Sequence, residues 1–135
     1  MPTFSDKSKK YLSECHPDLQ VIFNEVIKHF DCSVICGHRG AAEQNAAYEQ
    51  GMSKVQFPNS KHNKVPAMAV DVVPYPVDWN DRERMYFFAG HVIAIAKKLK
   101  ELGWIKSDIR WGGDWNQDTD TKKETFKDLP HFEII

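Results

Sequence analysis

The sequence predicts an α+β fold in which helices flank a small, mostly antiparallel sheet. Three observations indicate this class. Apolar residues recur at helical spacing in several segments, the strand-like segments are few and short, and the two kinds of segment follow one another in irregular order. At 135 residues, we expect a single domain, residues 1–135, that buries a core without disulfide bonds.

The first third of the chain predicts two helices and a strand. Ser5 can cap a short helix that ends near Glu14, and Pro17 suits the first turn of a second helix. A short apolar strand follows at Cys32–Cys36. The second helix would bury one apolar stripe, formed by Leu19, Ile22, Phe23, Val26, Ile27 and Phe30.

The middle of the chain predicts a helix, a loop and a strand. Residues 41–50 are rich in Ala, Glu and Gln and stop at Gly51, as expected of a helix with a glycine after its end. Residues 52–66 contain two prolines and several polar residues and predict a loop. Residues 67–73 predict a strand that Pro74 ends.

The last part of the chain predicts the longest helix and two short strands. Asn80 can cap this helix, which would run through Leu102. Strands are expected at Ile109–Trp111 and at 131–134, with a polar loop at 114–127 between them.

Composition excludes several classes of protein. The hydrophobic share of 41%, the charged share of 27% and the net charge of −1 are ordinary for a globular protein and do not suggest a nucleic-acid binder. No apolar stretch reaches the ~18 residues of a membrane span, and the N-terminus lacks the apolar core of a signal peptide. We therefore expect no membrane insertion and no export by the usual secretory route.

The three cysteines do not predict a disulfide or a metal site. On one strand, Cys32 and Cys36 would have α-carbons about 13 Å apart, at ~3.3 Å per residue, which is too far to bridge. Buried free thiols are the expected state.

Four residues carry the chemistry that the sequence suggests. His62, Asp71 and His131 offer two imidazoles and one carboxylate, a set that binds zinc and leaves a fourth position open, as in catalytic sites. Asp128 can serve as a general base beside that position. Alternatives remain open, because Asp71 would also suit a buried ion pair with an Arg and His131 could be an ordinary core or surface histidine.

The segments around these residues resemble a known family. Ser60-Lys61-His62, Ala69-x-Asp71-x-x-Pro74 and Asp128-x-x-His131-x-Glu133 resemble the LAS zinc peptidases. That family contains D-alanyl-D-alanine carboxypeptidases and dipeptidases, and phage L-alanyl-D-glutamate endopeptidases. The resemblance covers the chain from about residue 37 to the C-terminus and implies a hedgehog/D-Ala-D-Ala-peptidase-like fold. The small size, the lack of an export signal and Asp rather than Glu at position 128 resemble the single-domain phage endolysins.

The resemblance assigns roles to the four residues. His62, Asp71 and His131 would bind zinc. Asp128 would take a proton from the attacking water and return it to the leaving amine. One departure is the segment between His62 and Asp71, which has eight residues, Pro66 and no Gly, whereas the family spacing is shorter. A loop tolerates the extra length, but the rim of the cleft should differ.

Three further residues match family positions, each with an alternative role. Arg39 would stabilise the developing oxyanion, or form a surface or structural ion pair. Ser60 would hold the substrate backbone, or be a plain loop serine. Glu133 would orient a ligand imidazole, or lie exposed on its strand.

A second metal is suggested by oxygen ligands at alternate positions. Asp114, Asn116, Asp118 and Asp120 resemble the first half of a calcium-binding EF-hand loop. The strict motif fails, because its sixth position is Thr119 rather than Gly and its twelfth residue is not acidic. Some phage endopeptidases of the family have a calcium-responsive loop at the corresponding place. The resemblance thus implies a regulatory calcium ion, and the alternative is a solvated acidic loop.

Together these features predict a zinc endopeptidase that cuts the L-alanyl-D-glutamate link of peptidoglycan stem peptides during phage or prophage lysis. The resemblance implies a monomer that stays in the host bacterial cytoplasm until a holin-type partner releases it to the cell wall. One alternative is a D-alanyl-D-alanine carboxypeptidase or dipeptidase. The other is a non-catalytic zinc or calcium module that binds the cell wall.

Overall fold

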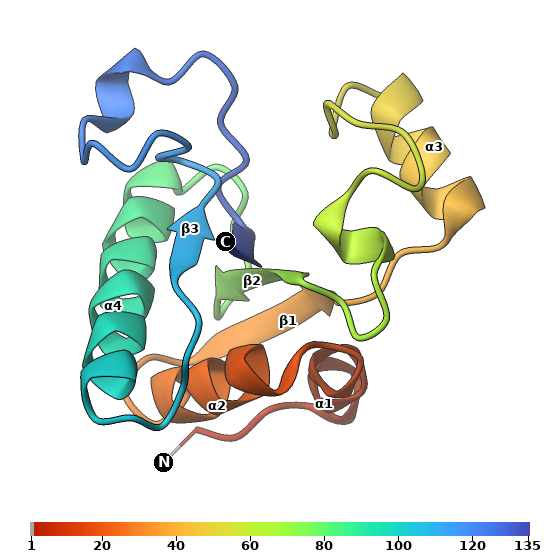
Figure 1. Ribbon diagram of the computed structural model, residues 1–135. Helices are drawn as coiled ribbons and strands as arrows, with labels where there is room; N and C mark the ends of the chain where they lie inside the picture. The colour runs from red at the N-terminus through yellow and green to blue at the C-terminus, as the bar shows by residue number, and fades with distance from the viewer. Residues whose placement is uncertain (1) are drawn as a thin grey trace.

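Figure 1 shows the protein as a computed structural model, which describes residues 2–135. These residues form helices α1 (Asp6–Ser13), α2 (Pro17–Val26), α3 (Ala41–Glu49) and α4 (Arg82–Glu101), strands β1 (Cys32–Cys36), β2 (Ala69–Pro74), β3 (Ile109–Trp111) and β4 (His131–Ile134), and short 3₁₀ helices η1 (Lys61–Asn63) and η2 (Thr121–Lys123). The strands form one antiparallel sheet in the order β1-β2-β4-β3. The predicted α+β class is confirmed.

The helix ends follow from local capping, with two corrections to the sequence prediction. Ser5 caps α1 by accepting a hydrogen bond from the Ser8 amide. The α2 helix ends at Val26, before the last members of its predicted stripe, and the chain turns there. The cap of α4 is Asp81 rather than Asn80, because the Asp81 carboxylate accepts from the Arg84 amide at 3.1 Å.

The two central strands bring the predicted ligands together. Every residue of β2 is buried, and in the register with β4 Asp71 lies opposite His131. Asp71 also pairs with Cys36 across β1, where the register shifts. The strand predicted at 67–73 begins two residues later, and Ala67 instead forms an isolated bridge with Cys15.

The core lies between the sheet and the helices α2 and α4. Phe132 of β4 meets Phe23 of α2 and Phe88 of α4, with ring centroids 5.5 and 6.2 Å apart. In Figure 1, α4 and α3 stand on opposite sides of the sheet. This core holds β2 and β4 in register, and thereby positions Asp71 and His131.

Two further features of the described residues concern the cysteines and the character of the helices. All three cysteines are free thiols, but Cys36 is only half-buried, unlike Cys15 and Cys32. Within residues 2–135, no helix combines the length and apolar character needed to cross a membrane.

Candidate active site

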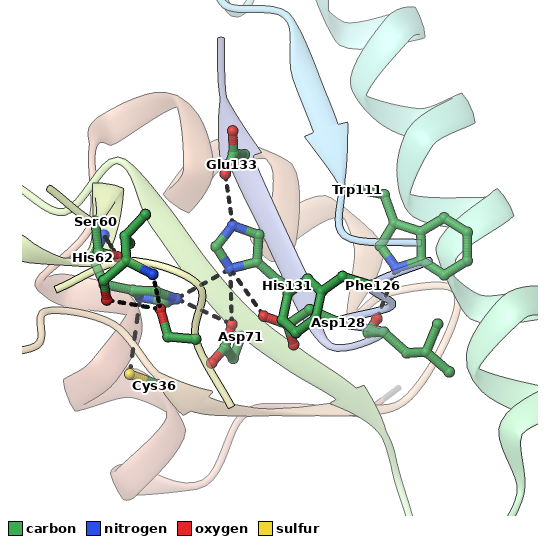
Figure 2. Close-up of polar contacts among 12 residues, drawn as sticks. Cys36, Ser60, His62, Asp71, Trp111, Phe126, Asp128, His131 and Glu133 are labelled. Atoms are coloured by element: carbon green, nitrogen blue, oxygen red, sulfur yellow. Dashed lines mark hydrogen bonds and ion pairs between the residues drawn. The ribbon is translucent and has the colours of Figure 1, made fainter. Parts of the chain in front are cut away.

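Three side chains converge where β2, β4 and η1 meet. His62 Nε2 lies 3.1 Å from Asp71 Oδ1 and 3.2 Å from His131 Nδ1, and the last two atoms are 3.4 Å apart. Figure 2 shows the three side chains pointing toward one another. With zinc bonds of about 2.0–2.1 Å, the edge of a coordination tetrahedron is roughly 3.3 Å. The donor set and its spacing fit a single zinc ion held from three sides.

Both imidazoles are oriented by a hydrogen bond on the far side of the ring. His62 Nδ1 lies 2.8 Å from the Gly37 carbonyl oxygen, and His131 Nε2 lies 2.8 Å from Glu133 Oε1. Because a carbonyl and a carboxylate only accept, each of these ring nitrogens donates. In the neutral form of each ring, the remaining nitrogen directs a lone pair at the common point, as metal-ligating histidines require.

The 3₁₀ helix η1 presents His62 to the site. Ser60 caps it: its hydroxyl accepts from the His62 amide at 3.2 Å, while the Asn63 side chain accepts from the Ser60 amide. Ser60 therefore has a structural role in presenting His62. The Ser60 side chain also lines the groove described below, so its contact with substrate stays a prediction.

The electrostatics of the cluster centre on the buried Asp71. Burial acts to raise its pKa, but the charges and hydrogen bonds of His62 and His131 outweigh burial and lower that pKa. For His62, burial acts to lower the pKa, and the Asp71 carboxylate raises it to about 10. Asp71 therefore remains an anion that attracts positive charge to this point, which suits a divalent cation.

Asp128 lies beside the three donors and is also oriented toward them. Its Oδ2 is 3.8 Å from His131 Nδ1. Gly112 allows this approach, because a Cβ there would collide with the Asp128 backbone, and the Asp128 amide donates to the Gly112 carbonyl at 2.8 Å. Burial, followed by the charge of Asp71, raises the pKa of Asp128 to about 6. Such a carboxylate is suited to receive and release a proton near neutral pH.

The raised pKa of Asp128 predicts the acid limb of the pH profile. A base works only when ionised, so activity should fall as the pH drops below about 6. Protonation of the two histidine ligands also competes with metal binding and strengthens this loss. The pH dependence of kcat/KM measures the effect, and undiminished activity at about pH 4.5 would contradict it.

Arg39 lies on the wall of the site between two partners. Its Nη2 is 3.4 Å from Asp71 Oδ2, and its Nη1 donates to Gln44 Oε1 at 3.1 Å. One carboxylate oxygen of Asp71 thus forms an ion pair with Arg39, and the other faces the two histidines. The guanidinium is fixed in place, as stabilisation of an oxyanion requires.

Cys36 is a neighbour of the site that the sequence did not reveal. Its Sγ lies 3.9 Å from His62 Nδ1 and 3.8 Å from Arg39 Nη2. Cys36, His62 and Asp71 form one group that could hold a metal, and Asp71, Asp128 and His131 form another. The thiol contacts the ring nitrogen that donates to Gly37. No motif marked Cys36, because the β1–β2 register brings it there.

Glu133 links His131 to two cations. It is buried rather than exposed, and its Oε2 lies 2.6 Å from Arg110 Nη2 and 3.5 Å from Lys61 Nζ. Burial acts to raise the pKa of Glu133, but the hydrogen bonds from His131 and Arg110 lower it to about 2. Glu133 is therefore ionised and can hold the His131 ring.

This contact predicts the effect of replacing Glu133. Glu133→Gln should weaken zinc binding about 10–100-fold, because the imidazole loses its charged acceptor. Competition titration with a chromophoric chelator measures the change. Glu101→Gln, at the exposed end of α4, is the matched control. Equal zinc affinity in both variants would remove the proposed role of Glu133.

A groove runs over the site between two loops. A cavity of about 510 Å³ is bounded by residues 53–62 on one wall and by residues 110–128 on the other, with His62 and His131 at its base. A second cavity of about 310 Å³ shares Arg39, Phe126 and Asp128 with the first. Asp128 thus borders both cavities.

The loop at 114–120 folds as calcium-binding loops do, although it lacks their glycine. Thr119 adopts φ +66°, the conformation for which such loops use Gly at this position, and its amide donates to Asp114 Oδ2 at 3.0 Å. The Asp118 amide donates to Asn116 Oδ1 at 3.2 Å, and the Asp120 amide to Asp118 Oδ1 at 2.8 Å. Within residues 2–135, Asp114 Oδ1 is buried without a hydrogen-bond partner. An unpaired buried carboxylate oxygen fits a cation there.

Trp115 connects this loop to His131, one of the three converging side chains. Its ring stacks on Phe126 with centroids 6.3 Å apart and lies 5.4 Å from the His131 ring. Trp115 thus packs between the 114–120 loop and His131 at the base of the groove.

Comparison with known proteins agrees with this geometry. Residues 2–135 match the family described as phage L-alanyl-D-glutamate peptidase. The structure is similar to the crystal structure of the Serratia marcescens L-Ala D-Glu endopeptidase ChiX, with a TM-score of 0.72 and 26% identity, over 98% of this chain and 90% of that one. The chain belongs to the phage L-alanyl-D-glutamate peptidase family.

Proposed function

We propose that this protein is a zinc-dependent L-alanyl-D-glutamate endopeptidase that hydrolyses peptidoglycan stem peptides. The observation that carries the proposal is the convergence of His62, Asp71 and His131 at tetrahedral spacing, with Asp128 beside them. Family membership and the similarity to an L-Ala D-Glu endopeptidase support the substrate.

The chemistry follows from the residues around the three donors. Zinc, when bound by His62, Asp71 and His131, supplies a positive charge that polarises a carbonyl and acidifies a water. Asp128 removes the proton of the attacking water and returns it to the leaving amine. Arg39 donates hydrogen bonds to the oxygen that gains negative charge, a contribution typically worth about 3–4 kcal/mol of barrier.

The open groove favours internal cleavage. An exopeptidase needs a closed pocket with a group that binds the terminal carboxylate. Here cavities on both sides share Arg39 and Asp128, so a peptide can extend in both directions. A D-alanyl-D-alanine carboxypeptidase or dipeptidase is therefore the second candidate.

Digestion of purified murein separates the two activities. The endopeptidase should release new amino termini on D-glutamate, detected by mass spectrometry. Products that lack only the terminal D-alanine would instead establish the exopeptidase. A non-catalytic cell-wall module would give no product, but the presence of both Asp128 and Arg39 in the site argues against it.

The remaining roles extend the same proposal. The chain would act as a single domain, residues 1–135, and as a monomer. It would serve as a phage or prophage lysis enzyme that remains in the host bacterial cytoplasm until a holin-type partner gives it access to the peptidoglycan.

We also propose that the 114–120 loop binds a regulatory calcium ion through Asp114, Asn116, Asp118 and Asp120. Isothermal titration of the zinc-loaded protein should then show one calcium site per chain. Asp114→Ala should abolish it, because this variant removes the buried unpaired oxygen. Asp108→Ala, at an exposed carboxylate paired with Lys100, should keep it. Absence of calcium binding at millimolar concentration would contradict the proposal.

A further inference from the structure

We propose that Lys54 binds the free carboxylate of the substrate glutamate and thereby determines specificity for a D-glutamate residue after the cleaved bond. This inference rests on the proposed endopeptidase function and names the side chain that recognises the glutamate of the substrate. Glutamate has two carboxyl groups, and the stem peptide continues through only one of them. The other stays next to the scissile amide, as a carboxylate or in amidated form.

The charges along the main cavity single out Lys54. The cavity is lined by four basic side chains besides the two histidines. Arg39 is within ion-pair distance of Asp71, and Lys61 and Arg110 are within that distance of Glu133. Among residues 2–135, no carboxylate lies within 4.0 Å of Lys54 Nζ. Lys54 is absent from the ion pairs of these residues, which are Lys28–Glu25, His29–Glu25, Arg39–Asp71, Lys61–Glu133, His62–Asp71, Lys100–Asp108, Arg110–Glu133, Lys123–Asp120, His131–Asp71, His131–Asp128 and His131–Glu133. Of the four basic residues that line the main cavity, Lys54 is therefore the one whose charge is available to pair with a substrate anion.

The position of the Lys54 ammonium places it over the groove. Lys54 belongs to one wall, and its Nζ lies 5.1 Å from the ring centroid of Phe126 on the opposite wall. Phe126 in turn stacks on Trp115, which contacts His131. The ammonium is thus held by a cation–π contact with Phe126, which precedes Asp128 by two residues in the chain. A carboxylate attached to the carbon next to the scissile nitrogen would enter the same space.

The segment that carries Lys54 is anchored to the catalytic wall through Gln44. The Gln44 side chain is fully buried, and its Nε2 donates to Ser53 Oγ at 2.9 Å and to the Val55 carbonyl at 2.7 Å. Its Oε1 accepts from Arg39 Nη1 at 3.1 Å. One amide therefore fixes both the backbone on either side of Lys54 and the guanidinium that faces the reacting carbonyl. This preorganisation favours binding of a substrate anion.

Other charges near the groove do not take this role. Glu124 lines the same cavity, but its Oε1 is turned to the Asn116 amide at 3.5 Å. Lys127 also lies over an aromatic ring, 5.8 Å from that of Tyr86 on α4, but it lines the second cavity rather than the main one that holds His62 and His131. Lys127 is a lysine of this neighbouring cavity, which makes it the matched control.

A pair of substrates tests the proposal. One is a stem peptide with D-glutamate, and the other is the same peptide with the free carboxylate converted to an amide. The wild-type enzyme should cleave the carboxylate form with a kcat/KM about tenfold higher, the size expected for a charge-assisted hydrogen bond. Lys54→Met should bring this ratio close to one, mainly through KM, Lys54→Arg should restore most of it, and Lys127→Met should retain it.

The ratio is insensitive to a general loss of folded enzyme, because both substrates share the catalyst. A ratio that is unchanged in Lys54→Met, or lost in Lys127→Met, would overturn the assignment of Lys54. Cleavage of neither peptide by the zinc-loaded wild-type enzyme would overturn the proposed function, and the role of Lys54 with it.

Discussion

Replacing Asp128 with Asn is expected to lower kcat by about 10²–10⁴-fold, the range typical for loss of a general base. Asn has nearly the same shape but cannot accept a proton from water. The three converging donors do not include Asp128, so zinc should remain bound at an unchanged stoichiometry. Stopped assays of murein digestion, together with elemental analysis of the same preparation, measure both quantities.

The matched control for this substitution is Asp108→Asn. Asp108 is exposed, and its ion pair with Lys100 lies outside the groove, so the change should leave kcat within about twofold, as is usual for surface substitutions. Lysis by Asp128→Asn at the wild-type rate would remove the assignment of the base. Loss of zinc together with activity would instead make Asp128 a metal ligand.

Replacing His62 with Ala is expected to abolish activity by removing the metal. Loss of a residue that only hydrogen-bonds to a metal ligand already lowers metal affinity roughly 10–100-fold. Loss of the ligand itself should therefore lower it by more than ~100-fold. The buried Asp71 would also lose the partner that lies 3.1 Å from it. Chelator competition measures the affinity, and a chelator should inactivate the wild-type enzyme reversibly, with zinc restoring it.

Two further variants make the His62 result interpretable. Asp71→Asn removes a second donor with little change in volume, and it should give the same loss of zinc. His29→Ala changes an exposed histidine paired with Glu25 and should retain full affinity. Wild-type zinc affinity in either His62→Ala or Asp71→Asn would contradict the proposed ligand set.

The sequence predicted those parts of the site that depend on short local patterns. The motifs singled out Asp71 and His131 on two expected strands, and the antiparallel register pairs the two residues directly. The fold class followed from the mixture of helical and strand-like segments. The cap of α4 was misplaced by one residue, because Asn80 and Asp81 are both good caps and only the backbone geometry distinguishes them.

The contacts that the sequence could not predict are long-range. In the sequence, Gln44 looks like an ordinary helix residue. The packing of α3 buries its side chain against Arg39 and the 53–55 segment. Cys36 reaches His62 only through the irregular register of β1 with β2. Thr119 adopts a positive φ that its residue type does not suggest, because the surrounding side chains accept the backbone amides of the loop.

Zinc K-edge X-ray absorption of the zinc-loaded protein tests most directly whether His62, Asp71 and His131 hold the metal. The ligand set predicts a first shell of nitrogen and oxygen atoms alone at about 2.0–2.2 Å, with multiple scattering from two imidazoles. A sulfur scatterer at about 2.3 Å would place the ion on Cys36 instead. That result, or a shell with a single imidazole, would contradict the proposed active site.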